Sequence, residues 1–141
     1  MKKALSVALS LIMVVMSLFL IVSCDSNEIE TGERLYTEDT TLGSGKTTFK
    51  FIVEHANSDK YTFTVNTDKT ILGDALVEAG LIEGENGPYG LYVKSVNGTS
   101  VDYNTSGGYY WSLYEGEKIA MTGVDGITIN PSVTYAFKVT K

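Results

Sequence analysis

Residues 49–65, with the sequence FKFIVEHANSDKYTFTV, give the clearest indication of the fold. Residues 49–53 carry a large apolar side chain at every second position, and residues 61–65 repeat the same alternation. A period of two is typical of strands that bury one face. The sequence ANSD at 56–59 between them favours a turn. We therefore predict an antiparallel β-hairpin.

The segment after the hairpin changes to helical spacing. Thr70 is the expected N-cap, and Gly80 is the expected C-terminal stop of this helix. Its apolar face consists of Ile71, Leu72, Ala75, Leu76 and Ala79.

Three more strands are predicted beyond the helix. Residues 83–90, rich in glycine, are expected to form a loop, and a strand over 91–96 ends at Asn97-Gly98, a tight-turn signal. Further strands are expected over 109–114 and 133–139. This order predicts an α+β protein of the β-grasp type. It has a mixed sheet of about 4–5 strands, one covering helix, and a parallel return of the strand that follows the helix.

The N-terminus has the layout of an export signal. Lys2 and Lys3 precede an apolar run over 4–22, which ends just before Cys24, the only cysteine. The ending resembles a bacterial lipobox, which implies that Cys24 carries acyl chains such as palmitate and becomes the first mature residue. A retained transmembrane helix and an ordinary cleaved signal remain alternatives. The expected location is the outer face of the cell membrane, in a Gram-positive bacterium.

These features divide the chain into a signal peptide (1–23), an acidic flexible tether (24–45) and one domain (46–141). With Cys24 used as an anchor, no cysteine is left for a disulfide or a thiolate metal site. Removal of Lys2 and Lys3 lowers the formal charge from −6 to −8. Such an acidic chain is not expected to bind nucleic acid, since that affinity comes from basic contacts to phosphates.

Four short motifs in a fixed order resemble the transcobalamin-like C-terminal domain, which includes bacterial lipoproteins of the domain-of-unknown-function 4430 type. In the vertebrate carriers of that family, this domain covers one face of cobalamin. Ser112 stands here where those carriers have glutamine, and no helical-barrel domain accompanies the module. The motifs are residues 70–81, Val96-Asn97-Gly98, Tyr109-Tyr110-Trp111, and Gly116 with Gly123-Val124.

The resemblance implies a lipid-anchored binding module that captures a corrinoid or a similar small molecule for a transporter. The alternative is a cell-surface module that contacts or assembles with another protein and has no small-molecule ligand. No cofactor is expected to be required, and cobalamin or another corrinoid is the possible ligand.

Aromatic side chains are the main signal for a binding surface, because a tyrosine ring offers flat area at a small cost in entropy. Trp111 lies on the more apolar strand face, which favours core packing, while Tyr110 and Tyr114 fall on the opposite face, where cross-strand pairing or burial against a loop is the alternative. The candidate ligand-binding residues are Tyr89, Tyr92, Tyr103, Tyr109, Tyr110, Trp111, Ser112 and Tyr114.

Catalysis and metal binding have little support in the sequence. His55 is the only histidine and is expected at a surface turn, without a neighbouring cysteine or carboxylate pair. No Ser/His/Asp arrangement or cysteine nucleophile has a recognisable spacing. We therefore expect a non-enzymatic protein without a resident metal.

Overall fold

The computed structural model describes residues 28–141, and within this range the chain forms two β-sheets with one α-helix. The predicted α+β class is confirmed. The strands are β1 (Thr40–Gly43), β2 (Thr47–Glu54), β3 (Lys60–Thr67), β4 (Ile82–Gly87), β5 (Gly90–Val96), β6 (Thr99–Ser100), β7 (Tyr110–Glu115), β8 (Lys118–Ile119) and β9 (Thr134–Thr140). The helices are α2 (Leu72–Glu78) and the 3-10 helix η1 (Val124–Gly126).

The larger sheet has the order β1-β3-β2-β9-β7-β8. Strands β2 and β3 form the predicted hairpin, and β9 runs parallel to β2 and antiparallel to β7. The central order β3-β2-β9-β7 with a helix over one face is the β-grasp arrangement. The sheet has six strands instead of the expected 4–5, because β1 and β8 extend its two edges.

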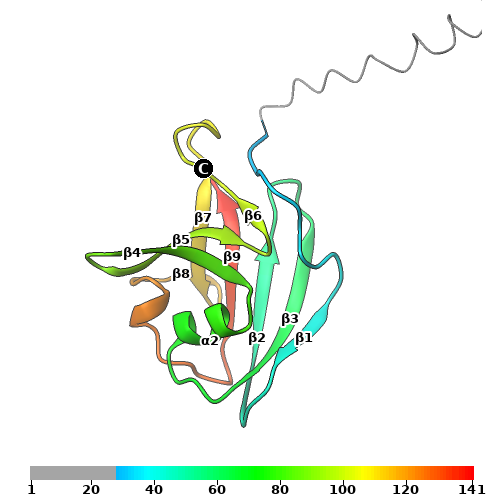
Figure 1. The fold of residues 1–141 in the computed structure, drawn as a ribbon, viewed down its shortest axis with the longest axis vertical. Coiled ribbons are helices and arrows are strands. Elements are labelled where there is room, and N and C mark those ends of the chain that lie inside the picture. The colour runs from blue at the N-terminus through cyan, green and yellow to red at the C-terminus, as the bar shows by residue number, and fades with distance from the viewer. Residues whose placement is uncertain (1–27) are drawn as a thin grey trace, which may run out of the picture.

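The core lies on the helix side of this sheet. Figure 1 shows α2 and the three-stranded sheet in front of β7 and β9, and side chains from all three layers join one buried cluster. Phe51 and Phe137, on paired strands, meet edge to face with ring centroids 5.9 Å apart. Leu72 and Leu76 of α2 are fully buried against the same cluster. The alternation read from residues 49–65 therefore marks the covered face.

The start of α2 differs from the prediction. Ile71, not Thr70, takes the N-cap position, and no side chain caps the helix. A tertiary backbone contact takes the place of the missing cap: Leu72 N, the first amide of the helix, donates a hydrogen bond of 2.9 Å to the Ile127 carbonyl, and Ile71 forms a β-bridge with Thr128. Gly80 follows the helix with a φ of 70°, as expected of the residue that stops it.

The prediction of a loop over 83–90 is wrong, because most of this segment forms β4 and pairs antiparallel with β5. Its glycine content disfavours a strand, yet Gly84 lies so close to the Tyr92 carbonyl that a Cβ would clash with it. Strand β5 does not join the main sheet. It lies between β4 and β6 in a separate sheet, and β9 supplies the parallel partner of β2.

The described part of the expected tether, residues 28–45, packs against the domain, and we call it the strap. Strand β1 within it pairs in parallel with β3, and Leu42 is buried. The ring of Tyr36 meets Phe63 edge to face at 5.6 Å. Composition predicts solvation here because apolar residues are few, but backbone pairing and these two anchors order the segment.

Cys24 and the predicted signal peptide lie outside the described residues. Within residues 28–141, no helix has the length and apolar character that a membrane crossing requires.

Candidate functional site

The eight candidate residues do not form one surface. Tyr89, Tyr92 and Tyr103 are exposed on the three-stranded sheet and the loop after it, and we call these three the tyrosine stripe. Tyr110, Ser112 and Tyr114 lie on the open face of the main sheet, whereas Trp111 lies in the core.

The tyrosine stripe borders two hollows that share Tyr92. The first, of about 350 Å³, is formed mainly by the β4–β5 turn with Tyr89 and by Gly123. The second, of about 330 Å³, lies between β5 and the following loop, with Lys94, Asp102 and Tyr103 in its wall. The exposed fractions of Tyr89, Tyr92 and Tyr103 are 99%, 65% and 61%. Large apolar rings are therefore presented to solvent beside concave surface.

A short turn places Tyr89 at the tip of the β4–β5 hairpin. Gly87 pairs with Gly90, so Pro88 and Tyr89 form the two-residue connection, and Gly90 has a φ of 100° that favours glycine. Leu91 N donates a hydrogen bond of 2.8 Å to Asp125 Oδ2 in η1. This bond fixes the hairpin close to its tip, next to the turn that carries Tyr89, to η1.

Charged and polar groups lie next to the rings. Lys94 Nζ is 2.7 Å from Glu85 Oε1 across the β4–β5 pair, and both side chains remain exposed. Asp102 Oδ1 accepts a hydrogen bond of 2.8 Å from Asn104 N and so shapes the loop that carries Tyr103. The second hollow therefore offers both donors and acceptors to a ligand stacked on a ring.

The open face of the main sheet is less accessible than predicted. Ser112 retains only 4% of its surface, so little of this residue is accessible to a ligand. Lys138 Nζ lies 4.6 Å from the centre of the Tyr114 ring, in cation–π geometry, so that ring is half-buried. Tyr110 keeps 41% of its surface. Neighbouring side chains thus cover much of this face.

Trp111 packs in the core, so it is not available as a ligand contact. Its exposed fraction is 8%, and its ring meets His55 edge to face at 5.7 Å. Its Nε1 has no hydrogen-bond partner among the described residues. Tyr109 is half-buried, with Lys141 Nζ 5.4 Å from its ring centre.

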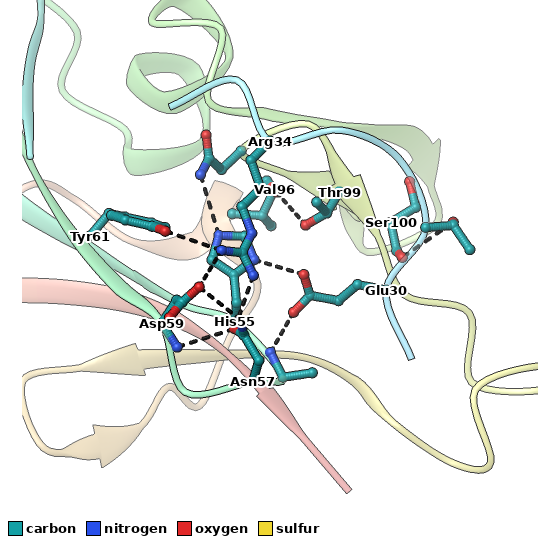
Figure 2. A network of polar contacts seen from close by, with 12 residues as sticks. Glu30, Arg34, His55, Asn57, Asp59, Tyr61, Val96, Thr99 and Ser100 are labelled. Carbon is teal, nitrogen blue, oxygen red and sulfur yellow. Dashed lines mark hydrogen bonds and ion pairs between the residues drawn. The ribbon is translucent and has the colours of Figure 1, made fainter. Parts of the chain in front are cut away.

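His55 is buried, not at the surface as predicted, because the strap covers it. Figure 2 shows Glu30 reaching His55 from the strap, where Glu30 Oε2 lies 2.7 Å from His55 Nδ1. The other carboxylate oxygen of Glu30 accepts a hydrogen bond from the Ala56 amide. Arg34 extends the network to Asp59 at 2.5 Å and to the Tyr61 hydroxyl at 3.1 Å.

A His–Glu pair can serve catalysis, but this one lacks a free ring nitrogen. His55 Nε2 lies 3.3 Å from Asn97 Nδ2. The Asn97 amide is oriented by Tyr36, whose N donates to Oδ1 and whose carbonyl accepts from Nδ2, both at 2.9 Å. Nδ2 therefore donates to Nε2, and Nδ1 donates to Glu30. The pair holds the strap in place and exposes no base to a substrate.

The carboxylates of this network have perturbed acidities. Burial raises the pKa of Glu30, but hydrogen bonds from His55 and Ala56 outweigh it, and the net pKa is below the ordinary glutamate value. The Arg34 hydrogen bond and charge hold the pKa of Asp59 below its usual range. Both groups are therefore ionised partners at neutral pH.

Sequence reasoning missed Glu30, Arg34 and Asn97 as network members. The composition of the strap predicts only a solvated spacer, and the Asn97-Gly98 pair predicts only a turn. The φ of 50° at Asn97 confirms the turn, but the Asn97 side chain is also completely buried. The sequence signal that could have found this network is Asn97 itself, because a side-chain amide that is buried at the end of the strand needs hydrogen-bond partners from elsewhere in the chain.

A model of the family described as a domain of unknown function, DUF4430, matches residues 68–141. The chain belongs to this family. The DUF4430 match begins after the β2–β3 hairpin and contains the whole tyrosine stripe. Among proteins with curated functions, none matches this chain significantly.

Two solved structures are similar to this DUF4430 protein. One is described as a proposed metal-binding protein from Ruminococcus gnavus, with 23% identity, 68% of this chain and 98% of that chain covered, and a TM-score of 0.63. The other is haptocorrin in complex with Cbi, with 12% identity, 70% of this chain and 27% of that chain covered, and a TM-score of 0.49. The first likeness supports the fold alone. In residues 28–141, no three His, Cys, Asp or Glu side chains are grouped to hold a metal ion.

Proposed function

We propose that this DUF4430 protein is a lipid-anchored extracytoplasmic binding module. It holds a flat, partly polar small molecule on the tyrosine stripe, and a corrinoid is the first ligand class to test. The anchor is Cys24, and a membrane transporter is the expected recipient of the ligand. The corrinoid follows from the sequence resemblance to the transcobalamin-like C-terminal domain.

The observation that carries the proposal is the exposure of the stripe beside the two hollows. Tyr89 retains 99% of its surface, so its ring contributes almost nothing to the packing of the described residues. A large ring left in water at a fixed hairpin tip is available for a ligand. Tyr92 lies between both hollows and is the expected centre of the contact.

The neighbouring polar groups support a ligand with hydrogen-bonding edges. A flat macrocycle with peripheral amides could stack on Tyr92 while its amides reach Lys94 and Asp102. The open main-sheet face offers a poorer surface, because Lys138 already occupies the Tyr114 ring. The stripe therefore replaces that face as the proposed site.

The test is a titration of residues 28–141 with cobalamin and with its precursors, followed by calorimetry and by the corrinoid absorption spectrum. We expect saturable binding that weakens at least about tenfold, or about 1.4 kcal/mol, in Tyr92→Ala. Tyr92→Phe keeps the ring and should keep most of the affinity. Tyr114→Ala is the matched control and should bind as the native protein does.

Two results would contradict this function. One is equal loss of affinity in Tyr114→Ala and Tyr92→Ala, which would move the site to the open face. The other is no binding of any corrinoid together with specific capture of a surface protein by the native chain but not by Tyr92→Ala. That result would favour the protein-interaction alternative.

A further inference from the structure

The chain is fixed to the domain almost from its first described residue. Thr31 exchanges two backbone hydrogen bonds with Ser100, of 2.8 and 2.7 Å. Glu30 binds His55 and Ala56 in the β2–β3 turn region. The expected spacer of 24–45 therefore shortens to the few residues before Glu30.

This attachment lies at one end of the molecule. Figure 1 shows the strap entering at the end of the long axis that carries the β2–β3 turn, the loop over 101–108 and the C-terminus. The opposite end carries the β1–β2 turn and the start of β9. Strand β2, which runs between the two ends, has eight residues and is about 26 Å long.

The distance from Cys24 to the domain is limited by covalent geometry. Glu30 is six positions after Cys24, and a fully extended chain gains at most about 3.6 Å per position, or about 22 Å in all. A lipid on Cys24 therefore holds this end of the domain close to the bilayer, and the opposite end is about one strand length further along the long axis.

We propose that the end formed by residues 56–59 and 101–108 rests against the phospholipid headgroup surface. This inference depends on the proposed lipidation of Cys24. The stripe begins there, since Tyr103 belongs to that loop. A ligand on the stripe would consequently be held near the membrane plane, where a membrane-embedded recipient can reach it.

The surface chemistry of this end suits a headgroup layer. Arg34 neutralises Asp59 there, which reduces repulsion from anionic lipids. Tyr103 is 61% exposed, and an amphipathic ring of this kind is favoured at a membrane interface. Asn104 and Thr105 add uncharged polar groups beside it. Asp102 and Glu28 are exposed acids at this end: the Asp102 carboxylate accepts a hydrogen bond from Asn104 N, and Glu28 lies beside Ala56 and Asn57.

The experiment uses the full lipidated chain in vesicles of phosphatidylglycerol and phosphatidylethanolamine. Asn104→Cys and Ser132→Cys place one free thiol at the near end and one at the far end, because the native cysteine is occupied by lipid. A fluorophore on each thiol is quenched by nitroxides attached to headgroups. We expect several-fold stronger quenching at position 104 than at 132. Insertion of a long Gly/Ser segment after Asn27 should reduce this difference.

The outcomes separate the two proposals. Mass measurement of the purified chain reports acylation independently of orientation, and an unacylated Cys24 overturns both the anchor and this inference. An acylated protein with equal quenching at both positions overturns the orientation alone. Stronger quenching at 132 than at 104 also overturns it and leaves the anchor intact.

Discussion

At the scale of single residues, the contact between strap and domain depends on two glycines. Gly98 follows Asn97 in the β5–β6 turn with a φ of 81°. A Cβ at this position would lie 2.2 Å from the Glu33 carbonyl oxygen in the strap. Gly32 lies opposite Gly98, and a Cβ on Gly32 would lie 2.5 Å from the carbonyl oxygen of Gly98. The two backbones approach closely because neither residue has a side chain.

Gly98→Ala should therefore destabilise the protein through both its backbone angle and the clash with Glu33. Gly107 is a matched control, since its φ of 79° is similar and nothing lies within 4 Å of its Cβ position. We expect Gly107→Ala to cost about 1–2 kcal/mol in unfolding free energy. Gly98→Ala should cost about 1–3 kcal/mol more. Equal losses in urea denaturation would show that the close approach is unimportant.

Glu30 should make the unfolding free energy depend on pH in the acidic range. Folding lowers the pKa of Glu30 and that of Asp59. The stability that these two carboxylates contribute is therefore complete above the pKa of an unfolded carboxyl group, about 4, and is lost as the pH falls through their folded pKa values. Glu30→Gln should lower the unfolding free energy at pH 7 and flatten its decline toward pH 2. Urea denaturation across this range measures both effects. An unchanged pH profile would contradict the role assigned to Glu30.

At the scale of elements, the strap acts as part of the fold. It supplies β1 to the sheet edge and fills the site beside Phe63 with Tyr36. It also satisfies the buried side chains of His55 and Asn97. These contacts involve groups that cannot reach water in the folded protein, which makes their loss expensive.

Removal of the strap should weaken the remaining domain. We expect residues 46–141 to unfold at a lower temperature than residues 28–141, because each unpaired buried polar group costs about 1–3 kcal/mol. The comparison is made by circular dichroism melts of the two chains. A shortened domain that melts at the same temperature would return residues 28–45 to the role of a spacer.

At the scale of the whole molecule, the proposed anchor at Cys24 would determine where the proposed binding surface operates. Cys24→Ser should move the protein from the membrane fraction to the culture medium, because no acyl chain can then be attached. Ser26→Ala is the control and should remain with membranes. Retention of Cys24→Ser in membranes would instead support the alternative in which the apolar segment over 4–22 is a retained helix.

The fold could be predicted to the extent that local patterns specify it. The hairpin of β2 and β3, the end of α2 at Gly80 and the Asn97-Gly98 turn all follow from residues within a few positions of one another. Period-two and helical spacing record which face is buried, so they also identified the covered face of the sheet. The exposed tyrosines were identified as residues, but not as a group.

The β-grasp class and an aromatic-rich surface can be predicted from the amino-acid pattern, because alternation and turn chemistry act over short distances. The ordered acidic strap, the strand β4 and the grouping of Tyr89, Tyr92 and Tyr103 become visible in the folded molecule. The order of the strap depends on partners far apart in the chain, such as Tyr36 and Asn97, which are 61 residues apart, whereas β4 pairs with the adjacent β5 despite its glycine content. No local pattern encodes a hydrogen bond across that separation, since its stability comes from burial after the chain has folded.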